Sequence, residues 1–339
     1  MVRLLYIILL SGISLCSGVS ASVSSDVSVV DSYRLQGLIP VRSNGNDVAS
    51  MMTKNYNNVV THCNEGTPAY FCSGITLRAT KPTARYNAWD PSPSSVASGG
   101  VSFSWLRKDA KFKGLVFNYL NGFVLFNKDD TPKNINNTMD YLCYYPEDAA
   151  SSHRPGNGCG ASTFFPEESG SCQLQGITTA GKWVTHFNSI VPGSYHRHQH
   201  QCGFLLQGEY NNADTFYQAI LAGNKLHGNG LLELNNEIRI STWDKTKAGY
   251  PQHFPLQAFF YINTSSKPTG ASDSIAWGLP GAQYDQRSFY QKTGVWVPII
   301  RITLPQSASE EVQFEYIKME QSVPETMDVL LLMSNFYYL

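Results

Sequence analysis

The feature that most constrains this chain is its set of cysteines. The sequence has seven, and six remain when Cys16, inside the apolar N-terminal segment, is set aside. An even number of cysteines in an exported chain predicts disulfide bonds, and the absence of any Cys-x-x-Cys pair argues against zinc binding or redox chemistry. Short loops close most readily, so each cysteine is expected to pair with its neighbour in sequence. The expected pairs are Cys63–Cys72, Cys143–Cys159 and Cys172–Cys202.

The N-terminal segment predicts export to a compartment where such bonds persist. Residues 1–21, MVRLLYIILLSGISLCSGVSA, carry one arginine, an apolar run and small residues before Ser22. This is the pattern of a cleavable signal peptide. The run from Leu4 to Leu10 is shorter than the ~20 residues of a spanning helix. We therefore expect a secreted protein, extracellular or periplasmic in transit, that starts near Ser22 and has no membrane span.

Composition and charge narrow the class of partner. Of the 339 residues, 42% are hydrophobic and 15% charged, which is typical of a globular protein. Lys and Arg number 25 against 26 Asp and Glu, for a formal net charge of −1, and no polybasic run occurs. A nucleic-acid-binding chain usually carries a basic patch or stripe. Nucleic acid is therefore not an expected partner.

The spacing of apolar residues mixes helix and strand periods and predicts one α+β domain with a sheet-rich core. Residues 22–50 are expected to form a flexible lead-in, and residues 51–339 the domain. The segment from Asp148 to Gln201 is expected to form disulfide-pinned loops around one helix. Helices are expected within 47–63, 108–120, 179–187 and 212–226. Strands are expected within 70–80, 101–107, 122–126, 140–146, 236–243, 256–263, 295–305 and 311–319.

Two short polar patterns lie on these expected strands. Arg78 is on the polar face of GITLRAT, where an arginine is most often solvated or in a structural ion pair. Ser102 and Ser104, in GGVSFSWLRKD, share one face of their strand because side chains repeat every two residues. Taken separately, each pattern is ordinary.

Taken together, the two patterns carry a family resemblance. An arginine in an early strand, followed by a Ser-x-Ser strand, resembles the Arg / Ser-Thr-Ser / Glu signature of the cholera-toxin-like ADP-ribosyltransferases, with Phe103 in place of the threonine. More narrowly, the chain is similar to the halovibrin family of secreted bacterial NAD-consuming proteins from about Met51 to Pro305. The segments that carry this are SGITLRAT, YNAWDPSPSSVASGGVSFSWLRKDAKF, NGCG, QCGF and NNEIRISTW. The resemblance implies an ADP-ribosyltransferase-like mixed sheet core with short helices.

The resemblance also implies chemistry at the nicotinamide–ribose bond of NAD, which would be a substrate. No metal is expected. That bond breaks through an oxocarbenium-like state, so the site needs a carboxylate near the ribose and a cation on the pyrophosphate. Arg78 would be the cation, because its planar fork holds two oxygens at once. Ser102 would orient the catalytic glutamate, and Ser104 would pack the floor of the site.

Two glutamates compete for the catalytic position, because no Glu-x-Glu or Gln-x-Glu closes the pattern unambiguously. Glu237 opens a strand in NNEIRISTW, inside the resemblance, and is favoured. Glu315 forms a literal Gln313-x-Glu315 but lies outside it. In the transferases that the chain resembles, the residue two before the glutamate helps to select or activate the acceptor. Here that residue is Asn235, which is unable to act as a base. Water is therefore the favoured acceptor, which predicts an NAD glycohydrolase, with a toxin that ADP-ribosylates a host protein as the close variant.

Three further interpretations remain open. Tyr86, Trp89 and Trp105 could stack on the rings of NAD, or be ordinary core and loop aromatics. They could instead form the contact surface of a non-catalytic adhesin or carbohydrate-binding module. A glycosidase could use Glu237 with Asp90 or Glu315.

A histidine run, SYHRHQHQC, raises a separate question. His196, His198 and His200 would share one face of a strand, an arrangement that resembles a zinc site. An exposed loop is the favoured interpretation, since no free thiolate or carboxylate is close in the sequence.

Overall fold

The computed structural model describes residues 44–80, 89, 95, 98–131, 139–149, 159, 171–192, 196–207, 213–233, 235–241, 255–268 and 276–325. The expected signal peptide and most of the expected lead-in lie outside these residues. Within them the fold is α+β, as predicted, and all the named strands belong to one nine-stranded sheet. None of the helices in these ranges is long and apolar enough to cross a membrane.

The strands follow the order β5-β4-β6-β2-β1-β3-β7-β8-β9 across the sheet. Neighbours are antiparallel except β7 and β8, which are parallel. A parallel pair needs a crossover connection, and helix α7 (Leu279–Thr293) lies in it. The strand bounds are β1 Ile75–Ala79, β2 Val101–Leu106, β3 Asn121–Leu125, β4 Asp140–Tyr145, β5 Phe204–Leu205, β6 Glu237–Ser241, β7 Leu256–Ile262, β8 Ile299–Thr303 and β9 Gln313–Tyr316.

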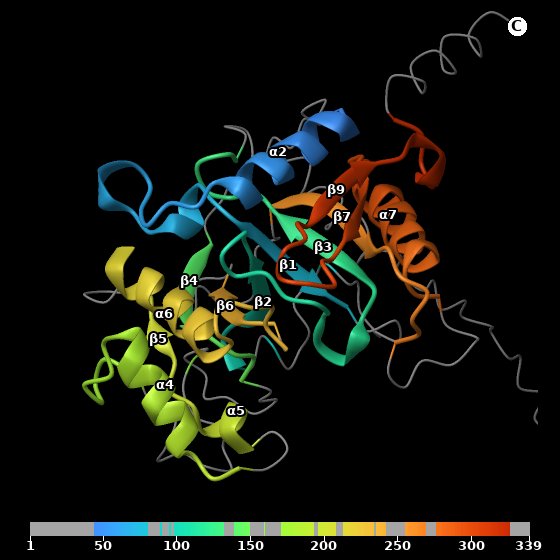
Figure 1. The fold of residues 1–339 in the computed structure, drawn as a ribbon. Coiled ribbons are helices and arrows are strands. Elements are labelled where there is room, and N and C mark those ends of the chain that lie inside the picture. The colour runs from blue at the N-terminus through green and yellow to red at the C-terminus, as the bar shows by residue number, and fades with distance from the viewer. Residues whose placement is uncertain are drawn as a thin grey trace, which may run out of the picture.

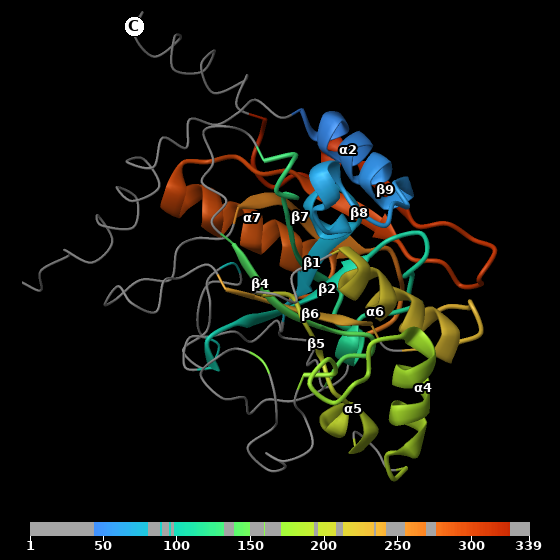
Figure 2. The same cartoon turned by 90° about the vertical axis from the view of Figure 1, so that its left-hand side faces the viewer.

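Helices pack on both faces of the sheet (Figure 1). Helix α2 (Gly45–Asn57) lies over β1, β8 and β9, whereas α6 (Ala213–Leu226) and α7 pack into the core on the other face. Helix α4 (Ala180–Ser189) packs on α6, and the short α5 (His196–His200) lies near it in both views (Figure 2). Four short 3-10 turns complete the described elements: Asn64–Gly66, Ala69–Phe71, Val116–Asn118 and Lys318–Glu320.

Alternation along the central strands divides their side chains between two cores. Phe103 and Trp105 of β2 join the core that contains Phe216 of α6. Ile75 and Leu77 of β1 join the core under α2. Successive strand residues point to opposite faces, so β3 and β7 each supply both cores.

The opening helix begins earlier than predicted. It starts at Gly45, and the side chain of Asn44 caps it by accepting a hydrogen bond from the Asn46 backbone at 2.9 Å. Val48 and Ala49 are buried, so the apolar face already extends into this first turn. Residues 45–50 therefore belong to the folded domain, and their assignment to a flexible lead-in is wrong.

The prediction of a helix over residues 108–120 is also wrong. The segment is a series of turns, with one 3-10 turn whose members Phe117 and Asn118 have positive φ angles of 56° and 53°. At its start, the buried Arg107 side chain is held by Asp109, at 2.6 Å from Nε to Oδ1. Phe112 then forms an isolated bridge with Leu232. Tertiary contacts therefore override the helical spacing of this basic segment.

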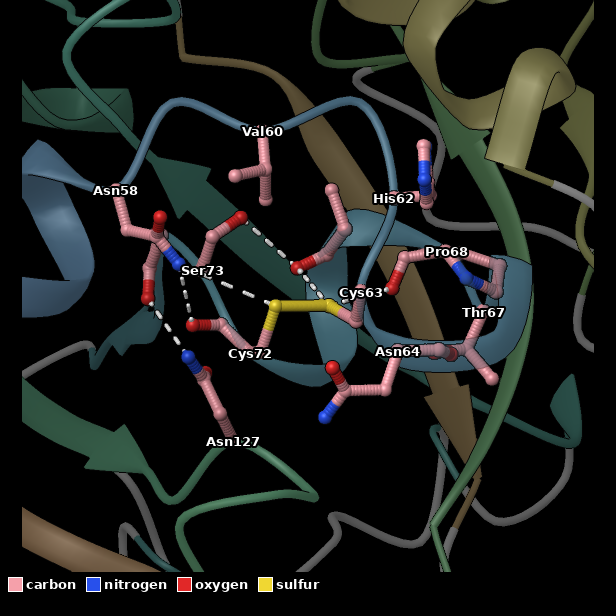
Figure 3. The surroundings of a disulfide bond; sticks show 12 residues. Asn58, Val60, His62, Cys63, Asn64, Thr67, Pro68, Cys72, Ser73 and Asn127 are labelled. Carbon is pink, nitrogen blue, oxygen red and sulfur yellow. Dashed lines mark hydrogen bonds between the residues drawn. A yellow bond between two sulfur atoms is a disulfide. The ribbon is translucent and has the colours of Figure 1, made fainter.

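The three expected disulfides are present: Cys63–Cys72, Cys143–Cys159 and Cys172–Cys202. Figure 3 shows the first, which lies between the end of α2 and the start of β1. Asn58 Nδ2 donates to the Cys72 carbonyl at 3.2 Å, and Asn127 Nδ2 donates to the Gly74 carbonyl at 3.1 Å. These bonds fix the chain just before it enters β1.

Candidate functional site

Strand β2 changes partners along its length, and the candidate site lies at this change. Its C-terminal part pairs with β1, and that ladder ends at the Leu77–Ser104 pair. Its N-terminal part pairs with β6, where Ser102 lies opposite Arg239. Strands β2 and β6 lie side by side in both Figure 1 and Figure 2. Ser102 is thus at the point where two parts of the sheet separate.

The predicted contact between Ser102 and Glu237 is present. Ser102 Oγ donates a hydrogen bond to Glu237 Oε1 at 2.6 Å. The other carboxylate oxygen, Oε2, accepts from the backbone N–H of Ala149 at 3.1 Å. Glu237 is only 2% exposed. Two directed donors therefore hold a buried carboxylate in one orientation.

Arg239 is a third member of this group that was not predicted. Its Nη1 donates to Ser102 Oγ at 2.7 Å and lies 3.8 Å from Glu237 Oε1. Its Nη2 donates to Ser98 Oγ at 3.1 Å and to the Gly100 carbonyl at 2.7 Å. The two-residue period of a strand places Arg239 on the same face as Glu237, so the spacing Glu-x-Arg was the available sequence signal. The guanidinium supplies the counter-charge that a buried carboxylate requires.

The two residues before Glu237 also attach to β2. Asn235 Nδ2 donates to Ser104 Oγ at 2.6 Å, and both residues are buried. Asn236 bonds the backbone of Trp105 twice, accepting from its N–H at 2.7 Å and donating to its carbonyl at 2.8 Å. The side chains of the NNE sequence thus extend the β2–β6 contact beyond the backbone ladder.

Arg78 contacts the backbone of Ser102, not its side chain. Its position opposite Phe123 places it on the sheet face opposite that of Leu77 and the two serines. Its Nη1 donates to the Ser102 backbone carbonyl at 2.6 Å. The Arg78 and Ser102 side chains therefore leave the sheet on opposite faces. Because the β1–β2 ladder has already ended, the guanidinium binds a carbonyl beyond its last pair.

Two of the predicted stacking aromatics are core residues. Trp105 is fully buried, packs edge-on against Phe216, and donates from Nε1 to the Ser73 carbonyl at 3.3 Å. Trp89 is 3% exposed and packs edge-on against Phe259 and Phe289. Neither presents a ring face to a ligand, because both fill the core between sheet and helices. Tyr86 and Asp90 lie outside the described residues.

Glu315 is not brought to the site. It lies on the edge strand β9, where its Oε2 accepts from Arg301 Nε at 3.1 Å in a surface ion pair. Five strands separate β9 from β6 in the sheet. Of the two candidate glutamates, only Glu237 contacts Ser102.

The histidine run forms helix α5, not a strand. The favoured interpretation, an exposed loop, is therefore wrong, because the segment is helical and His200 is only 4% exposed. The strand on which the zinc-like arrangement depended is not formed here either. Among the described residues, one group has ligand atoms close enough for a metal ion: Cys63, Cys72 and Asp129. Its two cysteines are bonded to each other, so they offer no thiolates.

No family model and no curated protein matches this chain. The family resemblance therefore remains a prediction from the sequence. The geometry itself defines a buried carboxylate that a serine hydroxyl and a backbone N–H orient. One guanidinium lies beside it, and a second binds the backbone carbonyl of the same serine. Such a preorganised negative charge can stabilise a positive charge that develops in a transition state.

Proposed function

We propose that this protein cleaves the nicotinamide–ribose bond of NAD with water as the acceptor, as a secreted NAD glycohydrolase. The observation that carries the proposal is the 2.6 Å hydrogen bond from Ser102 to Glu237. It joins the serine and the glutamate that the sequence pattern assigns to one site, although they are 135 positions apart. Arg78, the third member of the pattern, contacts the same serine.

In the proposed reaction the C–N bond between ribose and nicotinamide breaks, and the electron pair leaves with nicotinamide. The Glu237 carboxylate accepts a hydrogen bond from a ribose hydroxyl and stabilises the positive charge on the sugar ring. Water then adds to the sugar carbon and loses a proton, which yields ADP-ribose. Ser102 and the Ala149 N–H keep the carboxylate in place, and Arg239 lies beside it as the counter-charge. Arg78, half-buried on the other sheet face, binds the Ser102 carbonyl and so supports β2 in this proposal, rather than the pyrophosphate that the sequence pattern assigned to it.

The environment of Asn235 supports water over a protein side chain as the acceptor. Its amide nitrogen donates to Ser104, and an amide has no basic group to activate an incoming nucleophile. Transfer of ADP-ribose to a host protein remains the variant of the same chemistry.

The two other classes of function have less support. Burial of Trp89 and Trp105 removes two of the three aromatics on which a glycan-binding surface would depend. A glycosidase needs two carboxylates about 5 to 10 Å apart. Glu237 and Glu315 are separated by five intervening strands at about 4.8 Å per strand, so they cannot act as that pair.

Release of nicotinamide from NAD by the purified protein is the test of the proposal. Glu237→Gln keeps the shape but removes the charge, so the rate should fall by about 10²–10³. Ser102→Ala should lower the rate less, because the Ala149 N–H still holds the carboxylate. Glu315→Gln, the matched control on the surface, should leave it unchanged. Wild-type protein that leaves NAD intact, or a fully active Glu237→Gln variant, would overturn the proposal.

A further inference from the structure

A three-residue segment, Glu147–Ala149, connects Glu237 to a second buried charged group. At one end, the Ala149 N–H donates to Glu237 Oε2 at 3.1 Å. In the middle, the Asp148 N–H donates to the Asn235 carbonyl at 2.8 Å. At the other end, the side chain of Glu147 pairs with that of His227, which lies just after α6. The position of this segment therefore decides where the Ala149 N–H lies.

Other contacts hold the same segment but carry no charge. Gln201 Nε2 donates to the Glu147 carbonyl at 3.0 Å, and His198 Nδ1 lies 3.1 Å from the Asp148 carbonyl. In the Glu147–His227 pair, by contrast, both side chains can carry a charge. The Glu147 side chain is 2% exposed and that of His227 16%, so water can do little to replace either partner.

The charges around the pair favour a protonated His227. The hydrogen bond that His227 donates to Glu147 raises the pKa of His227 despite burial, and the nearby Glu233 raises it further, whereas Lys113 opposes this. Burial raises the pKa of Glu147, and the hydrogen bond and charge of His227 lower it only in part, so the net direction is upward. His198, whose own pKa burial lowers, and the buried Tyr144 also face this group.

We propose that His227 is a positioning residue for Glu237, and that its imidazolium holds Glu147 so that the Ala149 N–H stays on the Glu237 carboxylate. This inference rests on the proposed function for its effect on NAD cleavage. When His227 loses its proton, the Glu147 carboxylate is left buried without a counter-charge, which is costly. The segment then shifts, which loosens the hold of the Ala149 N–H on Glu237.

The sign of the pH effect follows from the raised pKa of His227. The pair is complete below the ordinary histidine pKa and is lost as the pH rises through the raised one. The rate constant for NAD cleavage should therefore fall on the alkaline side. KM should change little, because the group touches no part of the substrate.

The test compares His227→Gln with wild type across roughly pH 5 to 9, where histidines titrate. Glutamine can still donate to Glu147 but carries no charge, so kcat should be about tenfold lower at acid pH and lack the alkaline fall. The matched control is His186→Gln. His186 is also half-buried but accepts from the Cys202 N–H at 3.3 Å, away from the segment. It should keep the wild-type profile.

A second readout does not depend on activity: the hydrogen-exchange protection of the Ala149 amide, measured by NMR. Protection should fall in wild type as the pH rises, and should be low at every pH in His227→Gln. Glu147→Gln removes the carboxylate that needs a counter-charge, so it should fold and show no pH step even if His227→Gln is unstable. Wild-type protection that is independent of pH, or an unchanged step in these variants, would overturn the inference. An inactive wild type that shows the step would contradict only the proposed function.

Discussion

The Ser102 hydroxyl has one proton and two charged neighbours, and this decides its direction. A guanidinium cannot accept a hydrogen bond, so Arg239 must donate to Oγ and the hydroxyl proton must point at Glu237. Arg239 also binds Ser98 and Gly100 at the start of β2. One side chain therefore orients the serine, neutralises the glutamate and fixes the strand that carries both contacts.

Arg239→Lys should show how much of this depends on the planar guanidinium. Lysine keeps the charge but cannot reach Ser98, Gly100 and Ser102 together. We expect the free energy of unfolding to fall by about 1–3 kcal/mol and NAD cleavage to fall at least about tenfold. Denaturant titration and nicotinamide release are the measurements. Arg301→Lys, in the surface pair with Glu315, is the control and should change stability by less than about 0.5 kcal/mol. Similar losses in both variants would contradict the assignment.

At this scale the sequence predicted the serine and its glutamate but missed two of their partners. The strand period could have revealed Arg239, because residues two positions apart on a strand lie on the same face of the sheet. The Ala149 N–H was not, since a backbone donor in a loop leaves no mark in the residue types. Trp89 and Trp105 were ambiguous for a related reason: an aromatic residue in a pattern looks the same whether it binds a ligand or fills a core.

Among the elements, α7 depends on polar contacts that its sequence hides. Asn121, the first residue of β3, accepts from the Gly278 N–H at 3.2 Å, just before the helix, and donates from Nδ2 to Asp285 Oδ2 at 3.3 Å. Gly281 allows this close approach, because a Cβ there would lie 2.7 Å from Asn121 Oδ1. The buried face of the helix includes Asp285 and Gln286. Because polar residues interrupt its buried face, α7 does not show the helical spacing of apolar residues. No helix was predicted here from the sequence.

Asp285→Asn should change how stability depends on pH. Burial raises the pKa of Asp285 to about 7 from 3.8. Its neutral form is favoured in the folded protein, so the free energy of unfolding should fall as the pH rises from about 4 to 7, by at most on the order of 4 kcal/mol. The asparagine variant has no such charge and should lose less stability over this range. Urea unfolding at roughly pH 4, 6 and 8 measures the difference. Parallel curves for the two proteins would contradict a buried, neutral Asp285.

The other elements divide by whether local pattern or tertiary contact decides them. Strands such as β6 and β7 were predicted because β-branched and aromatic residues cluster there. The segment from Lys108 to Leu120 has helical spacing, but the buried Arg107 and the Phe112–Leu232 bridge hold it in turns. Strand β5 has only two residues, Phe204–Leu205, which is too short for any period.

At the scale of the whole molecule, three disulfides close loops of very different length. The paired cysteines are 9, 16 and 30 positions apart. Sequence proximity was enough to predict all three pairs, because no pair skips an intervening cysteine. The strand order could not be predicted in the same way. It places β6 between β4 and β2, which requires pairings between segments far apart in the chain.

The length of each loop predicts how much its disulfide stabilises the protein. In the chain-entropy model a longer loop restricts the unfolded chain more. Removing Cys172–Cys202 by a double serine substitution should therefore cost about 1 kcal/mol more than removing Cys63–Cys72 in the same way. Guanidinium unfolding measures both variants, and thiol labelling of the denatured wild type should find none of the six paired cysteines free. A larger loss for the shorter loop would show that native contacts around Cys63–Cys72, rather than loop entropy, decide the order.

The late position of β6 has a consequence for when the protein can become active. Ser102 and Glu237 are 135 positions apart, whereas the last disulfide is complete at Cys202. A chain emerging from the ribosome or the export channel therefore carries the serine long before the glutamate, and a fragment that ends ahead of β6 holds half of a site. Sheets built from such distant pairings form slowly. If the protein is exported and destroys NAD, as proposed, this order of synthesis delays the harmful activity until about 70% of the 339 residues have been made.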